Sequence, residues 1–460
     1  MGAGYGRRGA AAAALELTSA MGAGTMLEIA EIQSLSLCPV LTPGWLERAM
    51  YLFLRFDLPA DGARWLQRVA SRVTSAATWI GEPASTVGVA ISVWGLRALG
   101  ISPALLDGFA FEFRQGMVAR RLRGDSGTSA PSLWEGGLGT NVIHAVAVLA
   151  ARDEAALAAE RARIDAAGDG LAVTTQHVQD GHLLPEGREH FGFRDGFGQP
   201  TVEGTGLPPL PGEDTPLKAG EVIFGYEDEL GFTPHGPPPG RLGRNGTYLV
   251  VRKLAQDVAA FRAFLRSVAA DAADEERVAA KMVGRWRSGA PLVLAPDADD
   301  PALGVDLARN NDFAYGPTDA FGLRCPRGAH IRRANPRDSL VNVRRHRILR
   351  SGSAYGPPMP PGTSVEDGME RGVMFLAIGA SIGRQFEFVH DQWMNDGGFV
   401  ALGRETDPIT GAHGAEATFT ISRKPVRRKL VGLPRFVTVR GGEYFFVPSL
   451  SGVAFLGELA

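Results

Sequence analysis

The chain has 460 residues, in which 48 lysines and arginines nearly balance 50 aspartates and glutamates, for a formal net charge of −2. This balance excludes a polycation of the histone kind and a strongly acidic tail protein. Hydrophobic residues make up 45% and charged residues 21%, a composition typical of a globular protein with a large core. With 59 glycines and 30 prolines, we expect many long loops.

The only two cysteines, Cys38 and Cys325, exclude a disulfide framework and a cysteine-rich metal site. Charged residues interrupt every apolar stretch well short of the ~18 residues that a membrane helix needs; Arg97, for example, divides the run over 87–99. We therefore expect a cytoplasmic protein with no membrane partner.

The first residues carry a weak targeting signal. Arg7-Arg8 before an alanine run is similar to a twin-arginine export signal, but Glu16 interrupts the apolar region that such a signal requires. We expect residues 1–25 to be a disordered extension, with the globular part beginning at Met26.

The first predicted elements are a strand and a helix. Residues 49–56 are rich in aromatic and branched side chains and predict a strand. A helix follows from Asp61, with apolar residues every four positions on one face: Trp65, Val69 and Val73. Further along, a strand at 248–251 is again followed by an amphipathic helix over 261–268. This repetition indicates a duplicated α+β unit.

The remaining regular elements follow from the same patterns. Strands are predicted at 86–94, 171–177, 373–378, 436–439 and 444–447. Long helices are predicted over 141–166 and 273–286, and Pro/Gly-rich loops over 201–220, 233–246 and 352–362. Because strands and helices do not alternate strictly, the pattern favours an α+β fold over a doubly wound sheet. A boundary near residue 220 would divide the chain into 26–220 and 221–460.

The segment 191–200 (FGFRDGFGQP) is the first candidate functional feature. Three glycines and three phenylalanines surround Arg194 and Asp195. Glycines let the backbone approach another group closely, and apolar surroundings make a carboxylate responsive as a proton carrier. A tight turn in which Asp195 binds its own backbone explains the same pattern, and spacing alone favours the turn.

The second feature is His330, which lies in a strongly basic segment, 325–350. A neutral imidazole is a good ligand for iron, and clustered guanidiniums suit carboxylates or phosphates. A structural histidine within a solvated or nucleic-acid-facing patch is the alternative. We expect no nucleic-acid partner, because the segment has no interleaved aromatic residues and the whole chain is not basic.

Taken in chain order, five segments resemble the dye-decolorising peroxidases, and in particular the larger bacterial members of that family. The match runs from about Met26 to the end. The segments are GFRDG at 192–196, PLKAGE at 216–221 with GYE at 225–227, GAHIRRANPR at 328–337, RILR at 347–350 and RGGEYFF at 440–446.

The resemblance implies a fold of two ferredoxin-like units with antiparallel sheets. The unit over 26–220 would carry the G-x-x-D-G motif, and the unit over 221–460 would hold one haem b. In that arrangement His330 is the axial iron ligand. Asp195 and Arg350 would lie together across the opposite, distal face of the haem.

Other residues would contact the cofactor. The resemblance implies propionate-binding arginines, for which Arg332, Arg333 and Arg350 are candidates, and pocket residues, for which Phe193, Gly196 and Phe375 are candidates.

A hydrogen-bond acceptor should hold the other ring nitrogen of His330 and raise its basicity. The resemblance implies an acidic residue, and Glu387 is our candidate, with Ser381 and Asp391 as rivals. Some relatives carry asparagine two places after the distal arginine, where this chain has Gly352.

The implied function is a peroxidase that reduces hydrogen peroxide and oxidises dyes, phenols or other organic reductants through a ferryl intermediate. Asp195 would move the proton and Arg350 would stabilise the developing charge. Since an aspartic acid has a reference pKa of about 3.9 against ~6.5 for histidine, we expect turnover to peak on the acid side of neutral. A haem carrier or deferrochelatase-like protein on the same scaffold is the alternative. The sequence does not define an oligomeric state.

Overall fold

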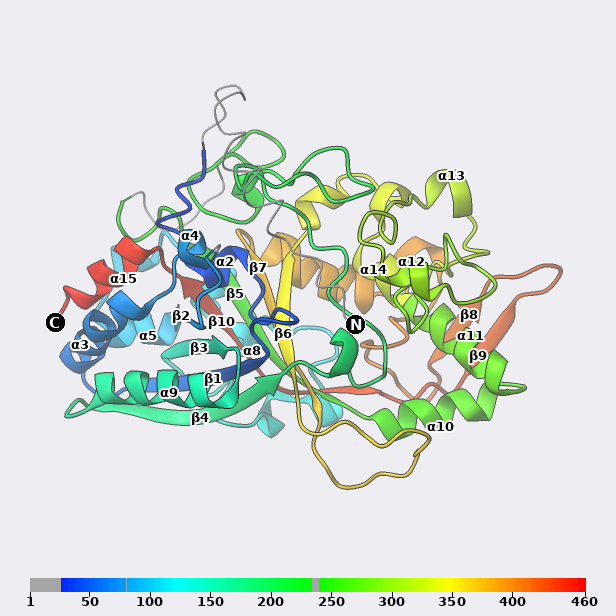
Figure 1. The fold of residues 1–460 in the computed structure, drawn as a ribbon, viewed down its shortest axis with the longest axis horizontal. Helices are drawn as coiled ribbons and strands as arrows, with labels where there is room; N and C mark the ends of the chain where they lie inside the picture. The colour runs from blue at the N-terminus through cyan, green and yellow to red at the C-terminus, as the bar shows by residue number, and fades with distance from the viewer. Residues whose placement is uncertain (1–25, 80, 234–239) are drawn as a thin grey trace.

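The structure is a computed structural model that describes residues 26–79, 81–233 and 240–460. Within these residues eight strands close into one barrel, in the order β1-β3-β2-β10-β5-β7-β6-β4. Helices cover the barrel at one end of the molecule, and further helices, a hairpin and long irregular segments extend from it at the other (Figure 1). The predicted extension over 1–25, and 234–239 of a predicted loop, lie outside the described residues.

The first half of the barrel follows a ferredoxin-like plan. It comprises β1 (Arg48–Phe56), α3 (Pro59–Val69), β2 (Ser85–Ser92), β3 (Ala145–Ala151), α9 (Glu154–Gly168) and β4 (Val173–His182). Its strands lie in the order fourth, first, third, second, and all its neighbouring strands are antiparallel.

The second half repeats this order. It comprises β5 (Thr247–Gln256), α10 (Val258–Val268), β6 (Leu349–Tyr355), β7 (Gly372–Gly379) and β10 (Val437–Val447). Its strands are also antiparallel and lie in the order β10-β5-β7-β6. The predicted α+β class with two ferredoxin-like units is therefore confirmed.

The two halves meet at two short seams. At one seam β10 pairs with β2 through Phe445↔Ser92 and Phe446↔Ile91. At the other, β6 pairs with β4 through a single residue pair, His182↔Ala354. Most of the edge of β6 is therefore without a strand partner in the described residues.

Shorter helices and a hairpin complete the described fold. The helices are α2 (Ser34–Leu37), α4 (Ala76–Trp79), α5 (Val93–Ala98), α6 (Pro103–Leu106), α7 (Phe111–Gln115), α8 (Met117–Arg120), α11 (Ala272–Val283), α12 (Pro301–Val305), α13 (Gly316–Asp319), α14 (His330–Ala334) and α15 (Leu450–Gly457). The hairpin is β8 (Thr418–Ile421) and β9 (Arg428–Val431). Two π-helical segments are η9 (Gly383–Glu387) and η10 (Val389–Met394). Single 3₁₀ turns lie at Ala70–Arg72, Gly127–Ser129, Pro131–Leu133, Pro185–Gly187, Ala219–Glu221, Arg337–Ser339, Val343–His346 and Phe399–Ala401.

The barrel strands are buried on both faces. On β10, Tyr444 and Phe446 belong to the core beneath the helices, whereas Phe445 and Val447 belong to the core inside the barrel. Such strands are apolar almost without interruption, because neither face meets water.

This double burial explains one wrong prediction. The expected helix over 141–166 is in fact strand β3 followed by helix α9. All seven residues of β3 are buried, so its run of alanine, valine and leucine shows no alternation. A continuous apolar run does not distinguish a buried strand from a buried helix. The predicted helices at 261–268 and 273–286 correspond to α10 and α11.

Most predicted strands are present. They are 49–56 in β1, 86–94 largely in β2, 171–177 in β4, 248–251 in β5 and 373–378 in β7. The strands predicted at 436–439 and 444–447 are parts of one strand, β10, whose register shifts between Val439 and Gly441. Strand β6 was not predicted, and part of it lies in the segment 352–362 that we expected to be a loop.

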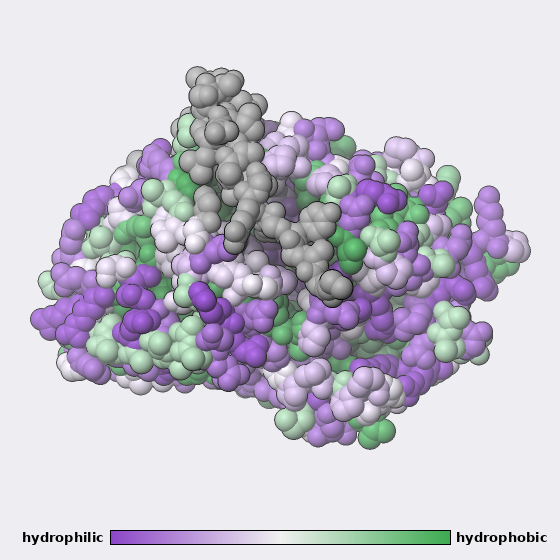
Figure 2. Space-filling model, viewed as in Figure 1, coloured by the Kyte–Doolittle hydropathy of each residue, from purple (hydrophilic) through white to green (hydrophobic). Residues whose placement is uncertain are grey.

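The surface seen from the same direction is mainly hydrophilic, with hydrophobic residues in small scattered groups (Figure 2). Within 26–79, 81–233 and 240–460, no helix has the length and apolar character needed to cross a bilayer. The predicted boundary at residue 220 falls in the connection 183–246 between β4 and β5, and the division into domains stays a prediction, as does the cytoplasmic location.

Candidate active site

A cavity of about 360 Å³ lies beside the sheet of the second half. Aromatic and aliphatic side chains from both halves form much of its wall, among them Phe191, Phe193, Ile331, Phe375, Phe386 and Val389. Cationic side chains also reach the wall: Arg285, Arg337, Arg347, Arg350 and Arg435. A mainly apolar cavity with several cationic groups suits a largely apolar ligand that carries acidic substituents.

His330, the first residue of α14, lies on the wall of this cavity with its side chain 25% exposed. Its Nδ1 lies 3.1 Å from both carboxylate oxygens of Asp407, whose side chain is fully buried. Asp407 also accepts hydrogen bonds from the backbone N–H groups of Ile409 and Thr410 and from the Thr410 hydroxyl. The carboxylate is therefore held rigidly behind the imidazole.

The pKa values of Asp407 and His330 shift in opposite directions. Burial would raise the pKa of Asp407, but His330 and the hydrogen bond from the Thr410 backbone lower it to about 2. Burial would likewise lower the pKa of His330, but the charge of Asp407 outweighs it and raises that pKa. Since an ionised carboxylate only accepts hydrogen bonds, Nδ1 must donate, and Nε2 of the neutral ring keeps its lone pair for a ligand.

Asp195 and Arg350 meet on the wall of the same cavity. The nearest atoms, Asp195 Oδ1 and Arg350 Nη1, are 4.0 Å apart, and the side chains are 64% and 36% exposed. Arg350 also donates from Nη2 to the carbonyl oxygen of Phe197, 2.9 Å away. The structure thus brings together the three residues from which the sequence predicted chemistry, namely His330, Asp195 and Arg350.

The Asp195 side chain also binds the backbone beside it, in a segment without regular structure. Asp195 Oδ1 accepts a 2.7 Å hydrogen bond from the N–H of Gly196, whose φ of +89° favours glycine. Of the alternative interpretation, the hydrogen bond from the backbone to Asp195 is present, whereas a tight turn over 195–200 is not. This hydrogen bond fixes Oδ1 and leaves Oδ2 as the second oxygen.

The predicted pocket residues divide into two groups. Phe193 and Phe375 lie on the cavity wall, and their contact with a cofactor stays a prediction. Gly196 does not line the cavity, and its place in the motif is explained by its backbone conformation.

The prediction that Arg332 and Arg333 face the cofactor is wrong. Arg332 donates to Asp319 and to the carbonyl oxygen of Cys325, and Arg333 donates to main-chain carbonyls of Trp393 and Glu405. Both side chains are almost completely buried in the protein, and neither lines the cavity.

The helix geometry explains this difference. On α14 the residues that reach the cavity are His330, Ile331 and Ala334. Positions four apart lie on one helix face, so the face defined by His330 and Ala334 leaves the two intervening arginines directed away.

The prediction that Glu387 holds the ring of His330 is also wrong, because Asp407 does so. Glu387 instead accepts hydrogen bonds from Arg120 Nε at 2.9 Å and from the Tyr444 hydroxyl at 2.9 Å. The two rivals have other partners: Ser381 accepts from the N–H of Arg384, and Asp391 contacts His390 Nδ1 and the N–H of Arg123.

Sequence reasoning missed Asp407. It lies 77 residues after His330 and is separated from it by β6, β7 and both π-helical segments. The only local signal is the segment DPIT at 407–410, in which an aspartate caps the N–H groups that follow it. That pattern indicates a turn and does not indicate a histidine partner.

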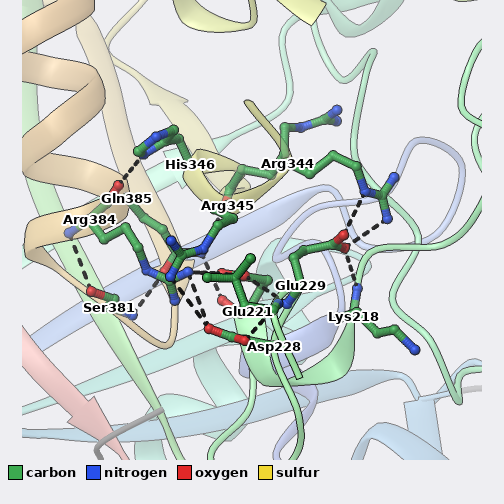
Figure 3. Close-up of polar contacts among 12 residues, drawn as sticks. Lys218, Glu221, Asp228, Glu229, Arg344, Arg345, His346, Ser381, Arg384 and Gln385 are labelled. Carbon is green, nitrogen blue, oxygen red and sulfur yellow. Dashed lines mark hydrogen bonds and ion pairs between the residues drawn. The ribbon is translucent and has the colours of Figure 1, made fainter. Parts of the chain in front are cut away.

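A network of ion pairs holds the turn Val343–His346, which directly precedes Arg347 and β6 (Figure 3). Arg344 pairs with Glu229 at 2.8 Å, and Arg345 pairs with Asp228 at 3.6 Å. Residues from η9 and from the β4–β5 connection complete it: Arg384, Gln385 and Glu221. The start of the strand that carries Arg350 is thus anchored to two other segments of the chain.

A duplicated ferredoxin-like barrel, and one cavity lined by a carboxylate-held imidazole and an aspartate–arginine pair, fit the class of haem peroxidases. The chain is 34% identical to a dye-decolorizing peroxidase of Mycena epipterygia, in an alignment covering 89% of this chain and 84% of the relative. It is 29% identical to a multifunctional dye peroxidase of Amycolatopsis, covering 90% and 92%. The chain belongs to the dye-decolorising peroxidase family.

Solved structures agree with this assignment. A fungal DyP-type peroxidase from Auricularia auricula-judae matches with a TM-score of 0.82 at 28% identity, covering 94% of this chain and all of that one. A dye-decolorizing peroxidase in complex with 2,6-dimethoxyphenol matches with a TM-score of 0.84 at 29% identity and the same coverage. No protein-family model matches the chain. The relatives with high identity are mainly fungal, and placement in a larger bacterial subgroup stays a prediction.

Members of this family are haem enzymes, and the residues present fit a haem. The imidazole has one nitrogen committed to Asp407 and the other available, on the wall of a mainly apolar cavity. Tyr315 also lines the cavity, and its buried hydroxyl has no hydrogen-bond partner among the residues that the structure describes. A buried phenol normally has a partner, which a carboxylate group of a bound ligand or a water molecule would provide.

Proposed function

We propose that this peroxidase binds one haem b through His330 and reduces hydrogen peroxide with Asp195 and Arg350, taking electrons from dyes, phenols or similar organic donors. The observation that carries the proposal is the placement of Asp195 Oδ1 4.0 Å from Arg350 Nη1 on the wall of the cavity that His330 also lines. Phenols and dyes are supported as donors by the names of the relatives and by the 2,6-dimethoxyphenol complex of one of them.

His330 Nε2 would ligate the iron, with Asp407 fixing the ring and raising its basicity. Arg350 would face the acidic substituents of the porphyrin. Bound haem would supply the iron redox chemistry of peroxide reduction and of one-electron oxidation of the donors.

Asp195 is the proton carrier in this proposal. Peroxide cleavage requires one proton to move from the inner to the outer oxygen, and a carboxylate that first accepts and then donates that proton suffices. Because Oδ1 already accepts the N–H of Gly196, Oδ2 takes the proton. The hydrogen bond from the Gly196 N–H holds the carboxylate in place without another side chain.

Arg350 stabilises charge and moves no proton, because a guanidinium does not lose its proton in proteins. Its Nη2 is fixed by the Phe197 carbonyl, whereas Nη1 points toward Asp195. A fixed cation close to the departing oxygen stabilises negative charge as it develops.

The test is the rate at which haem-loaded protein reacts with hydrogen peroxide in stopped flow, for the wild type and for Arg350→Leu. We expect the substitution to slow this reaction by roughly 10²–10³-fold while haem stays bound, because one preorganised charge-stabilising group is lost. The control is Arg309→Leu, whose side chain is 67% exposed and outside the cavity.

An unchanged rate in Arg350→Leu contradicts the assigned role. If peroxide consumes the haem and frees iron without oxidising 2,6-dimethoxyphenol, the deferrochelatase-like alternative is supported instead.

A further inference from the structure

The edge of β6 at Arg350 is covered by a side chain. On one side Arg350 pairs with Ala377 of β7, whereas the nearest pairing on the other side is His182↔Ala354 with β4. The N–H and C=O of Arg350 that face this open side need other partners, because buried main-chain polar groups are almost always hydrogen-bonded. The partner in the structure is Gln199.

Gln199 binds both main-chain groups of one residue. Its Oε1 accepts the N–H of Arg350 at 3.0 Å, and its Nε2 donates to the carbonyl oxygen of Arg350. A carboxamide has one acceptor and one donor, as a peptide group does, so it reproduces the pair of hydrogen bonds that a neighbouring strand would make. A carboxylate or a hydrocarbon of the same length cannot make both.

Gln199 lies four residues after Asp195 on the same loop. Two further hydrogen bonds tie this loop to the start of β6: Phe197 O accepts from Arg350 Nη2 at 2.9 Å, and Gly198 O accepts from Arg347 Nη2 at 3.0 Å. Between Asp195 and Gln199 the chain passes through Gly196 and Gly198, which have φ of +89° and +74°. Glycines do not restrict the backbone, so the position of Asp195 depends on contacts such as these.

We infer that Gln199 is the positioning residue that sets the distance between Asp195 and Arg350. The inference rests on the proposed function, in which these two residues act together on peroxide. Gln199 does not line the cavity, so it acts through the two residues and not on the substrate. We call the two hydrogen bonds between Gln199 and the backbone of Arg350 the clamp. A displacement of about 1 Å between reacting groups costs roughly 100-fold in rate, so the loss of the clamp should slow the peroxide reaction strongly.

The experiment compares wild type, Gln199→Glu and Gln199→Leu at pH 7. Gln199→Glu keeps the size of the side chain but places an ionised oxygen against the carbonyl of Arg350. We expect both variants to bind haem at the wild-type ratio and to react with peroxide roughly 10–100-fold more slowly. Oxidation of 2,6-dimethoxyphenol by enzyme already oxidised with peroxide should keep its rate. Unequal effects on the two half-reactions distinguish positioning from general damage to the fold.

A second readout does not depend on activity. Hydrogen exchange of a peptide covering 347–352 should become faster in both variants, because the N–H of Arg350 loses its acceptor or is pushed from it. Gln176→Leu, an exposed glutamine on β4, is the matched control and should change neither readout.

Each outcome tests a different part of the inference. Unchanged exchange in both variants overturns the clamp, and faster exchange with an unchanged peroxide rate overturns its role in positioning. An equal loss in both half-reactions, or loss of haem, indicates a structural role only and also overturns the inference. If the wild type itself fails to react with peroxide, the proposed function and the catalytic part of this inference fail together, while the exchange data still decide whether the clamp exists.

Discussion

The two halves of the barrel share one strand order but differ in the segments that join the strands. In the first half the connections span 57–84 and 152–172, and each packs one long helix on the sheet. In the second half the corresponding connections span 257–348 and 380–436, and both contribute walls of the cavity.

One strand order therefore supports a packed outer face in the first half and a cavity in the second half. The outer face of the first half is filled by side chains such as Trp65, Leu66 and Val69, all at most 1% exposed. The second half presents an imidazole and several guanidiniums to an open volume instead. Helices therefore seal the outer face of the first half, whereas in the second, open half the inserted segments and residues of the sheet together line the cavity.

The largest effect expected from this contrast is on haem content. His330→Ala should leave the protein folded but with almost no haem, because His330 is the proposed iron ligand in the open half. The measurement is Soret absorbance per protein after purification from haem-replete cells. The control is His182→Ala, a half-buried histidine on β4 of the sealed half, which should keep its haem. Full Soret absorbance in His330→Ala would place the ligand elsewhere.

A substitution in the core of the first, sealed half should lower the free energy of unfolding. Trp65→Ala removes a side chain that is 1% exposed, and we expect the free energy of unfolding to fall by about 3–5 kcal/mol, the usual cost of emptying such a core site. The measurement is the urea midpoint followed by circular dichroism. Phe321→Ala, at a side chain 75% exposed, should change stability by only about 0.5 kcal/mol or less. A small effect of Trp65→Ala would show that the first half is less tightly packed than its burial indicates.

Strand β10, whose pairing with β2 joins the two halves, should make stability depend on pH. Glu443 lies on β10, is 2% exposed, and has a pKa that burial raises from 4.5 to about 7. The folded state therefore binds this proton more tightly than the unfolded state. The contribution to stability is present below pH 4.5 and is lost as pH rises through about 7.

That contribution amounts to about 3 kcal/mol between the two pH values. Gln at this position carries no proton to lose, so the difference in urea midpoint between Glu443→Gln and wild type should grow from pH 4.5 to pH 7. A difference that does not change with pH would mean that Glu443 is solvated in the folded protein.

The smallest expected effect is on haem affinity, and it distinguishes the two buried carboxylates Asp407 and Glu387. Asp407→Asn should weaken haem binding by roughly 10–100-fold, because the neutral amide orients His330 without its charge. Glu387→Gln should leave haem affinity unchanged, since Glu387 binds Arg120 and Tyr444. The measurement is haem transfer to apomyoglobin. The opposite ranking of the two variants would restore Glu387 as the functional partner.

The sequence allowed prediction of the residues that lie in compact motifs. His330, Asp195 and Arg350 each stand in a short segment whose composition is unusual, and the structure brings them to one cavity. The duplicated fold was implied by the resemblance to the family, and the repeated strand and helix patterns over 49–73 and 248–268 agreed with it.

What could not be predicted depends on contacts distant in the chain or on the direction of a side chain. Asp407 reaches His330 only through the fold. Arg332 and Arg333 carry the right charge, but α14 directs them into the protein. Strand β3 has the composition of a helix, and only its place in the sheet makes it a strand.

Helix α15 has a consequence for biosynthesis. Its buried residues Val453 and Leu456 pack on α3, which was synthesised almost 400 residues earlier, as the interval from residue 69 to 450 shows. Strand β10 likewise reaches its neighbour β2 late. During translation, the apolar surface of α3 and the edge of β2 stay exposed until residues 437–457 have been synthesised and can cover them. Nascent chains should therefore depend on chaperones until the end of translation.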